Sequence, residues 1–427
     1  MTVGPVGRAL GVKEQPNPPE TGPRHARDSR QADRAWWRDL VWTSLVIWAL
    51  RVGVGIAAEK FTMLALPSGS SLTGGLANQY TVDATKGGGL AHGLLHWDAV
   101  YYLAIAHFGY PGGSGHLSPE AAFFPLYPLL VSAVGHVVPF ATHPYEVAAL
   151  AVSWASLLVA IAGVMAIVRE WTGSTDYADA AIAFAWFPAS VFLIAGYPES
   201  LFVALVAWTL YFVTRERYLV AAVLAGVCSA SRMEGALLIV VILWPVVTRR
   251  IPPLRGMALA VVAELGLLGY AAFCWANYGS PIAFLHAEKY WNRRLTWPLH
   301  PVEAFLVSWA HGQQTIGSQT AVLALDSVLG LGAVAATIGF VWWAWGRREL
   351  LGGVAILTVL LTVLAISSGP SGRSPEAMGR FVMCIVPLYA LVPVLLPRIP
   401  GGRSLLAASA GVALVAQTLF TLGYWFT

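Results

Sequence analysis

Long apolar segments recur along the whole chain and constrain its fold more than any other feature. They run for about 17 to 24 residues, the length that an α-helix needs to cross a ~30 Å hydrocarbon layer. Of the 427 residues, 57% are hydrophobic and 11% are charged, whereas an average soluble domain has about 25% charged residues. One soluble core cannot bury so much apolar surface, so the sequence predicts an all-α polytopic membrane protein.

Eleven segments have the composition of membrane-spanning helices. Two of them, 218–231 and 235–248, are short and read as a broken pair that meets at residues 231–235. Irregular backbone is tolerated at membrane depth only where protein or water satisfies its polar groups. The predicted spans are 40–58, 147–168, 178–195, 200–214, 218–231, 235–248, 257–275, 322–345, 350–366, 381–396 and 404–425.

The arginines between these spans predict the orientation. A further apolar stretch, 122–138, either spans the membrane or lies at its interface. If it lies at the interface, the basic connections and the arginine-rich N-terminus share one face, which is then cytoplasmic by the positive-inside rule. If it spans, the later basic clusters face outward. We therefore expect an interfacial helix there, a cytoplasmic N-terminus and a multi-pass protein of the cell membrane.

The chain divides into a tail and one membrane domain. Residues 1–38 are rich in Pro, Gly and Arg and lack apolar periodicity, which predicts a disordered basic tail in the cytoplasm. Residues 39–427 form the predicted transmembrane domain, with residues 59–146 as a long first outer loop that contains interfacial helices. The net charge of +4 does not indicate nucleic-acid binding, because much of the Lys and Arg flanks the spans.

Two acids on the predicted outer face, Asp98 and Glu199, lie close to aromatic residues in the sequence. Asp98 follows His96 and Trp97 at the start of a short amphipathic segment, where it is either a helix N-cap or a general base that meets a hydroxyl at the membrane surface. Glu199 follows Tyr197 at a turn between two apolar runs. It either interacts with a helix dipole or takes part in chemistry.

Basic residues on the same face predict an anionic ligand. Arg232 lies in a turn near membrane depth, where it either pairs with Glu234 or binds a phosphate. The segment 286–294 is basic and aromatic and includes His286 and Lys289; it either anchors the protein at the interface or binds substrate. Arg380 opens a span on the side where cations are disfavoured, which a negatively charged ligand would explain.

Other polar residues give no comparable signal. Glu264 and Asp326 lie within or near apolar runs, where each can bind a neighbouring helix, and neither is included in the predicted site. The histidines of the first outer loop have no zinc-ligand spacing and few acids around them, so no metal site is expected. They are His92, His96, His107 and His116.

Several short motifs occur in order between about residues 96 and 390: His96-Trp97-Asp98-Ala99, Ala122-Phe123-Phe124-Pro125, Gly196-Tyr197-Pro198-Glu199-Ser200, Ser231-Arg232 and Arg380-Phe381. Together they resemble the PIG-V family of mannosyltransferases, which belongs to the GT-C class of membrane glycosyltransferases. The resemblance implies a polyprenyl-phosphate sugar donor used on the non-cytoplasmic side. It also implies that Trp97-Asp98 is the functionally important Trp-Asp pair of the first outer loop and that Glu199 is the acid of the second.

Residues and resemblance together predict transfer of mannose, with inversion, from a polyprenyl phosphate to a lipid or glycolipid acceptor, without a cofactor. Asp98 and Glu199 are the predicted catalytic residues. A glycolipid or lipid-phosphate transporter and an inactive scaffold are the alternatives; a transporter would place polar groups near the midplane rather than on one side. The predicted substrate-binding residues are His96, Trp97, Tyr197, Arg232, His286, Lys289 and Arg380.

Overall fold

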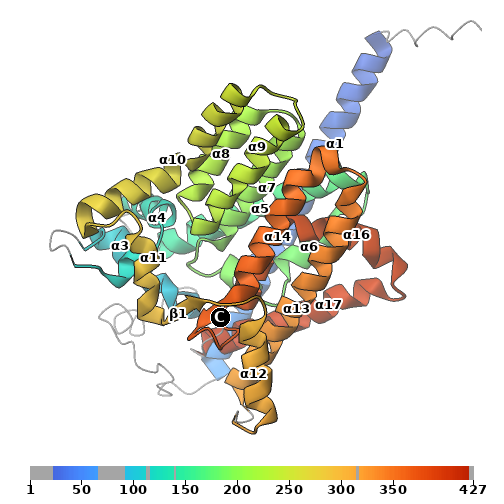
Figure 1. Ribbon diagram of the computed structural model, residues 1–427. Coiled ribbons are helices and arrows are strands. Elements are labelled where there is room, and N and C mark those ends of the chain that lie inside the picture. The colour runs from blue at the N-terminus through green and yellow to red at the C-terminus, as the bar shows by residue number, and fades with distance from the viewer. Residues whose placement is uncertain (1–22, 66–91, 112–115, 139–140, 314–316, 423–427) are drawn as a thin grey trace, which may run out of the picture. The chain divides into compact units, whose positions relative to one another are not determined.

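The computed structural model describes residues 23–65, 92–111, 116–138, 141–313 and 317–422. The chain divides into two compact units, residues 1–42 and residues 43–427. Within the described residues nearly all regular structure is helical, and two three-residue strands form a small sheet (Figure 1). The elements are α1 Pro23–Ala65, η1 His92–Leu94, α3 Asp98–Phe108, η2 Pro119–Ala122, α4 Leu126–Val137, α5 Pro144–Thr172, α6 Tyr177–Ala185, η3 Ser190–Leu193, α7 Glu199–Thr214, α8 Tyr218–Ser229, η4 Met233–Leu238, α9 Ile239–Val247, α10 Pro253–Tyr278, α11 Ala283–Ala287, η5 Glu288–Trp291, β1 Arg293–Leu295, α12 His300–Ala310, α13 Ser318–Trp345, α14 Arg348–Ser367, β2 Ser368–Pro370, α15 Met378–Met383, η6 Val386–Leu391, α16 Val392–Leu395, η7 Leu396–Arg398 and α17 Gly402–Thr421.

Six of the described helices are long and apolar enough to cross a membrane, and five more apolar helices are shorter. The prediction of an all-α polytopic membrane protein is therefore confirmed. The six long segments are Arg34–Leu64, Pro144–Thr172, Pro253–Tyr278, Gln319–Trp345, Arg348–Ser367 and Gly402–Thr421.

The first helix begins earlier than the sequence suggested. α1 starts at Pro23, so residues 23–38, predicted to be a disordered tail, are helical, while residues 1–22 lie outside the described part. This stretch contains Ala, Arg and Gln, which favour helix, but it has no apolar face. A rule that requires such a face therefore misses it.

The apolar stretch 122–138 contains one short helix. It is α4, which has 12 residues and is therefore about 18 Å long at 1.5 Å per residue. Since α8, a predicted span, has the same length, the interfacial position of α4 stays a prediction. Residues 66–91, 112–115 and 139–140 of that loop lie outside the described part.

One predicted span is broken where the site begins. The segment 178–195 forms α6 and then the 3₁₀ turn η3. The fully buried Arg51 donates hydrogen bonds to the carbonyl of Ala185 at 3.0 Å, to the carbonyl of Ser190 at 2.9 Å and to Oε1 of Gln417 at 3.0 Å. The guanidinium thereby supplies hydrogen-bond donors to carbonyls on both sides of the break. The chain continues from this break into Tyr197 and Glu199.

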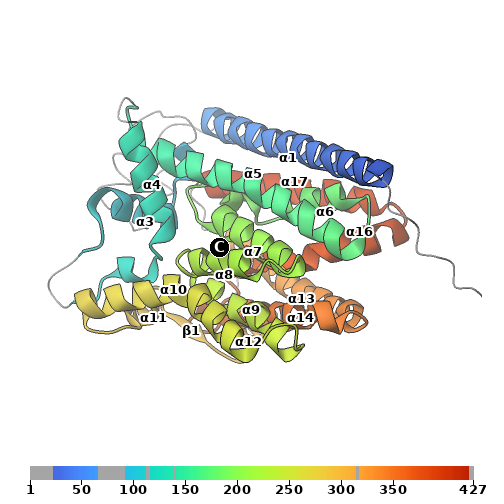
Figure 2. The ribbon, with the colours of Figure 1, turned by 90° about the horizontal axis from the view of Figure 1, so that it is seen from above.

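A bundle of close-packed helices supports the pocket that follows. Figure 2 shows α8, α9 and α10 next to one another, and α7 beside α8. Glycines permit the approach of α8 and α10, because a side-chain carbon at Gly226 would collide with the carbonyl of Val262, as is common for small residues between membrane helices. α8 ends just before the turn that carries Arg232.

The small sheet joins the segment before α12 to the segment after α14. β1 and β2 pair antiparallel, with Arg293 opposite Pro370 and Leu295 opposite Ser368. Neither strand has an alternating apolar pattern, and the sequence did not predict the sheet. Its effect is to tie the segment after α10 to the segment that leads into α15.

Candidate active site

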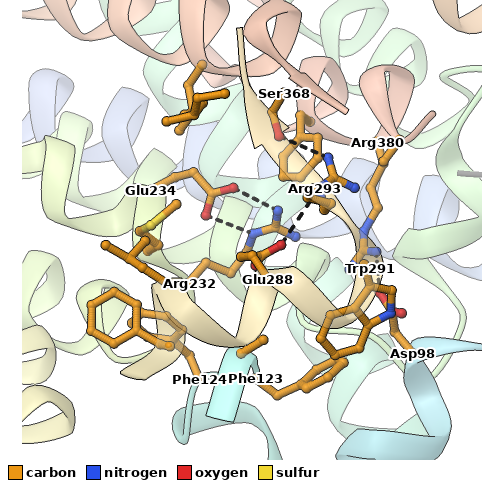
Figure 3. Close-up of a pocket in the computed structure, with 18 of the residues that line it drawn as sticks. Asp98, Phe123, Phe124, Arg232, Glu234, Glu288, Trp291, Arg293, Ser368 and Arg380 are labelled. Atoms are coloured by element: carbon orange, nitrogen blue, oxygen red, sulfur yellow. Dashed lines mark hydrogen bonds and ion pairs between the residues drawn. The ribbon is translucent and has the colours of Figure 1, made fainter. Parts of the chain in front are cut away.

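Charged side chains from distant parts of the chain meet in one pocket of about 420 Å³, shown in Figure 3. Its walls come from the start of α3, the segment before α4, the turn before η4, the region from η5 to β1, and α15. Phe123, Phe124 and Trp291 line one side (Figure 3). The charged lining residues are Asp98, Glu234, Glu288, Arg232, Arg293, Arg294 and Arg380.

Asp98 is fixed at the first position of α3. Trp97 is the N-cap residue and has a φ of 61°, a conformation that a bulky residue rarely adopts. The hydroxyl of the buried Tyr197 holds this turn: it donates to the carbonyl of His96 at 3.0 Å and accepts from the amide of Asp98 at 3.1 Å. The Asp98 carboxylate accepts a hydrogen bond from Nη1 of Arg380 at 2.6 Å. Asp98 is therefore not the helix cap, and its side chain belongs to the pocket.

Glu199 lies behind the pocket and joins two arginines. Its side chain is fully buried, and its Oε1 accepts hydrogen bonds from Nη1 of Arg232 and from Nε of Arg380. Arg232 also donates from Nη2 to Oε1 of Glu234 at 3.0 Å. The five side chains thus alternate in charge, from Asp98 through Arg380, Glu199 and Arg232 to Glu234. In such an arrangement each buried ion has an opposite charge as its neighbour, which offsets the cost of its burial.

Aromatic rings enclose the two guanidinium groups of this chain of charges. The Arg232 guanidinium carbon lies 5.2 Å from the ring centre of Phe381. That of Arg380 lies 5.1 Å from the ring of Phe192 and 4.8 Å from that of Tyr197. Rings at this distance attract a cation and keep water away from it. The ion pairs are therefore stronger than they would be in water.

Asp326 holds the short helix that carries Arg380. Ala377, before α15, has a φ of 70°, and the amide of Gly379 donates to Oδ1 of the buried Asp326 at 2.8 Å. A side-chain carbon at Gly379 would come within 2.7 Å of that same oxygen. Asp326 was left out of the predicted site, and the structure places it where it fixes the position of Arg380 without lining the pocket.

A third arginine stands apart from the other two. Arg293, on β1, donates from Nη2 to Oγ of Ser368 at 3.3 Å, and its Nε lies 3.9 Å from Oε2 of Glu288. Burial lowers the pKa of the Arg293 guanidinium, and Glu288 only partly opposes this change. Burial likewise raises the pKa of the half-buried Glu288 carboxyl, with Arg293 opposing. Both groups are therefore incompletely compensated.

The predicted site residues fall into three groups. Asp98, Arg232 and Arg380 line the pocket, and Tyr197 and Glu199 lie behind it, at 1% and 0% exposed. The structure thus brings five of the nine predicted residues together. The two buried ones position Asp98 and the arginines and do not face the cavity.

The other four predicted residues lie around the pocket. His96 and Trp97 are half-buried in the turn before α3 and are not part of the pocket lining. His286 and Lys289 line a second, more polar cleft of about 630 Å³. This cleft shares Leu285, Glu288, Arg293 and Arg294 with the pocket, so the two cavities meet at that wall.

Sequence reasoning missed Glu288 and did not single out Arg293. Both lie in the segment 286–294, which also fits an interfacial anchor. One signal was present, because Glu288 is the only acid in that segment. Within the described ranges no group of three or more His, Cys, Asp or Glu residues could hold a metal ion.

The solved structures that are similar to this chain include several of an oligosaccharyltransferase from Archaeoglobus fulgidus. The apo form has a TM-score of 0.46 and 13% identity over 90% of this chain and 55% of the other. The enzyme in complex with an inhibitory peptide and a dolichol-phosphate has a TM-score of 0.45 and 12% identity over 92% and 56%. This chain thus spans about half of the length of those structures.

Sequence comparison gives a closer relationship. No curated protein matches the chain significantly. Residues 124–368, however, match glycosyltransferase family 87, and this region includes Glu199, Arg232, Glu234, Glu288 and Arg293. Because it covers more than half of the 427 residues, this membrane protein belongs to glycosyltransferase family 87.

Proposed function

We propose that the chain transfers mannose from a polyprenyl-phosphate donor to a lipid or glycolipid acceptor. Membership of glycosyltransferase family 87 supports the transfer of a sugar. The apolar helices support substrates whose lipid chains stay in the bilayer while their head groups reach the pocket. The choice of mannose, and the relationship to the PIG-V family and the GT-C class, are supported by the motifs around Asp98 and Glu199.

The proposed site lies on the outer face of the cell membrane, within a single domain over residues 39–427. The distribution of arginines supports this orientation, since the basic connections between the helices lie on the opposite side from the pocket-forming segments in the predicted topology. On that face the donor cannot be a nucleotide sugar of the cytoplasm, which again favours a lipid-linked donor.

One observation carries the proposal: a carboxylate, Asp98, lies at a pocket of arginines and is aimed by one of them. Its side chain is 16% exposed and is held by Arg380 at 2.6 Å. A general base must be in a fixed position and within reach of the hydroxyl that it deprotonates. Asp98 is held in a fixed position and lines the pocket in which we place the acceptor hydroxyl, whereas the fully buried Glu199 cannot contact an acceptor. We therefore assign the base role to Asp98 and a positioning role to Glu199.

The proposed reaction is a single displacement. Asp98 accepts the proton of the acceptor hydroxyl as its oxygen bonds to the anomeric carbon of the donor. The bond from that carbon to the phosphate oxygen breaks, and its electron pair leaves with the polyprenyl phosphate. Attack opposite the leaving group inverts the anomeric centre. The arginines that line the pocket stabilise the negative charge that grows on the departing phosphate.

Asp98→Asn tests the assignment, because Asn keeps the shape of the side chain and can still accept from Arg380. Purified protein is given radiolabelled polyprenyl-phosphate mannose and a membrane lipid extract, and labelled lipid is counted. We expect a rate about 100- to 10,000-fold lower than that of the wild type, since this is the usual contribution of a general base.

Glu303→Gln is the matched control, because Glu303 is an exposed acid on α12 that does not line the pocket. Its rate should equal that of the wild type. A rate for Asp98→Asn close to the wild type would remove Asp98 as the base. Transfer from a glucose-carrying donor but not from the mannose-carrying one would overturn the choice of sugar.

A further inference from the structure

The three buried or half-buried arginines of the pocket differ in how well their charges are compensated. Arg232 hydrogen-bonds to Glu199 and Glu234, and Arg380 hydrogen-bonds to Glu199 and Asp98. Each of them therefore has two carboxylates at contact distance. A ligand that bound either guanidinium through these nitrogens would have to compete with them.

Arg293 has no such pair within the part of the chain that the structure describes. Its acidic neighbour, Glu288, lies at 3.9 Å, beyond hydrogen-bonding distance, and its hydrogen bond to Ser368 is neutral. Yet the Arg293 side chain is only 19% exposed. A largely buried guanidinium whose one acidic partner lies beyond hydrogen-bonding distance is incompletely compensated, so an anion that hydrogen-bonds to it would lower the free energy of the protein.

The three charged side chains at this wall, Arg293, Arg294 and Glu288, carry a net charge equal in size and opposite in sign to that of one phosphodiester. Asp98, Glu199 and Glu234 contact Arg232 and Arg380, which leaves Glu288 alone beside Arg293 and Arg294. For Arg294, which lines the pocket next to Arg293, no acidic contact occurs among the described residues. Two positive charges and one negative charge leave a surplus of one positive charge. A sugar linked to a lipid through a phosphodiester carries one negative charge.

The Arg293 side chain is also held in place before any ligand arrives. β1 pairs with β2, which fixes the backbone of Arg293 opposite Pro370, and Oγ of Ser368 accepts from its guanidinium. The ring of Phe381 lies 5.2 Å from its guanidinium carbon. Pre-organisation of this kind reduces the entropy that binding costs.

We infer that Arg293, assisted by Arg294, binds the phosphate group of the lipid-linked donor. The inference rests on the proposed function, which it deepens by naming the residues that recognise the phosphate. Arg232 and Arg380 then serve chiefly to hold Asp98 and Glu234 in position. The sheet of β1 and β2 acquires a role as well, since it carries the phosphate-binding arginine to the pocket.

Binding, rather than turnover, tests the inference. Protein in nanodiscs of phosphatidylcholine is titrated with farnesyl phosphate and, separately, with farnesol, and the ratio of the two affinities reports recognition of the phosphate. The wild type should prefer farnesyl phosphate by about 10- to 100-fold, as expected for hydrogen bonds to a charged group. Arg293→Gln should reduce that ratio to near one. Arg293→Lys should keep part of it, because Lys supplies charge without the planar fork.

Two further variants separate this effect from loss of folding. Arg255→Gln, an exposed arginine on α10 outside the pocket, should leave the ratio unchanged. Glu288→Gln should raise the affinity for farnesyl phosphate several-fold, because it removes the negative charge that competes for Arg293. A misfolded protein cannot bind more tightly, so this variant tests the site in the opposite direction.

The outcomes distinguish the inference from the proposed function. If the wild type prefers the phosphate and Arg293→Gln keeps the same ratio, the inference is wrong and the proposed function stands. If the wild type shows no preference for farnesyl phosphate over farnesol, the lipid-phosphate donor itself is refuted. If Arg293→Gln loses binding of phosphatidylinositol but keeps that of farnesyl phosphate, the phosphate belongs to the acceptor and the inference is again overturned.

Discussion

Replacing Glu199 by Gln removes one charge from the middle of the buried network and keeps the shape of the side chain. Oε1 of Glu199 accepts from both Arg232 and Arg380, and a hydrogen bond to a charged group contributes about 1.5–3 kcal/mol. The Gln amide oxygen can still accept, but as a neutral group it retains only part of each contribution. We therefore expect Glu199→Gln to destabilise the protein by about 3 kcal/mol.

The free energy of unfolding in mixed detergent micelles, measured over a range of denaturing detergent, checks this magnitude. Glu216→Gln is the matched control. Glu216 also accepts from an arginine, Arg250, at 3.0 Å, but its side chain is 61% exposed. An exposed ion pair contributes only about 0–1 kcal/mol, so the control should unfold close to the wild type.

The same variant separates a positioning role from a binding role. Without Glu199 the Arg380 guanidinium loses its buried anchor, and Asp98 loses the fixed partner that aims it. We expect kcat to fall at least about tenfold, while the preference for farnesyl phosphate over farnesol stays near that of the wild type, because Arg293 does not contact Glu199. Equal stability of Glu199→Gln and wild type, or a loss of the phosphate preference with unchanged kcat, would refute this reasoning.

Two further predictions concern the groups around Asp98 and Arg293. Tyr197→Phe removes the hydroxyl that bridges the carbonyl of His96 and the amide of Asp98. We expect a loss of about 2 kcal/mol in unfolding free energy and a lower kcat with unchanged donor affinity. An unchanged kcat would show that Asp98 does not depend on this hydroxyl. Burial raises the pKa of Glu288, so Glu288 takes up a proton at a higher pH than an ordinary Glu. Below that pKa it no longer opposes an anion at Arg293, and the affinity for a non-hydrolysable phosphodiester analogue of the donor should rise as the pH falls. Glu288→Gln should abolish this pH dependence, and an identical pH profile in both proteins would contradict it.

The sequence alone singled out four of the charged residues that meet at the pocket, but not their pairing and not Glu288 or Arg293. Asp98, Glu199, Arg232 and Arg380 are conspicuous because charges are costly beside apolar helices. Their contacts depend on tertiary structure: Asp98 meets Arg380 from 282 positions away, and Arg380 meets Glu199 from 181 positions away. No local pattern specifies such contacts. The sequence therefore does not predict which arginine is paired with a carboxylate and which is available to a phosphate.

The elements that escaped prediction share a physical reason. The strands Arg293–Leu295 and Ser368–Pro370 have three residues each, too few for a periodic pattern, and they form because the two segments meet in space. The predicted span 381–396 is divided into α15, η6 and α16 because Pro387 and Pro393 interrupt the helix hydrogen bonds. The motif around Tyr197 predicted that it binds substrate. The structure instead buries it and hydrogen-bonds its hydroxyl to the turn that carries Asp98.

The family match covers much of the pocket but not the pair of Asp98 and Arg380. The region that matches glycosyltransferase family 87 spans residues 124–368, so Asp98 and Arg380 lie on either side of it, outside the match. Although these two residues are 282 positions apart in the sequence, Nη1 of Arg380 lies 2.6 Å from Oδ2 of Asp98. The assignment of Asp98 as the base therefore does not follow from the family match. Loss of transfer by Asp98→Asn would support a role that the motif and the pocket geometry propose together. Unchanged transfer would leave the family assignment intact and would move the base to another acid of the pocket.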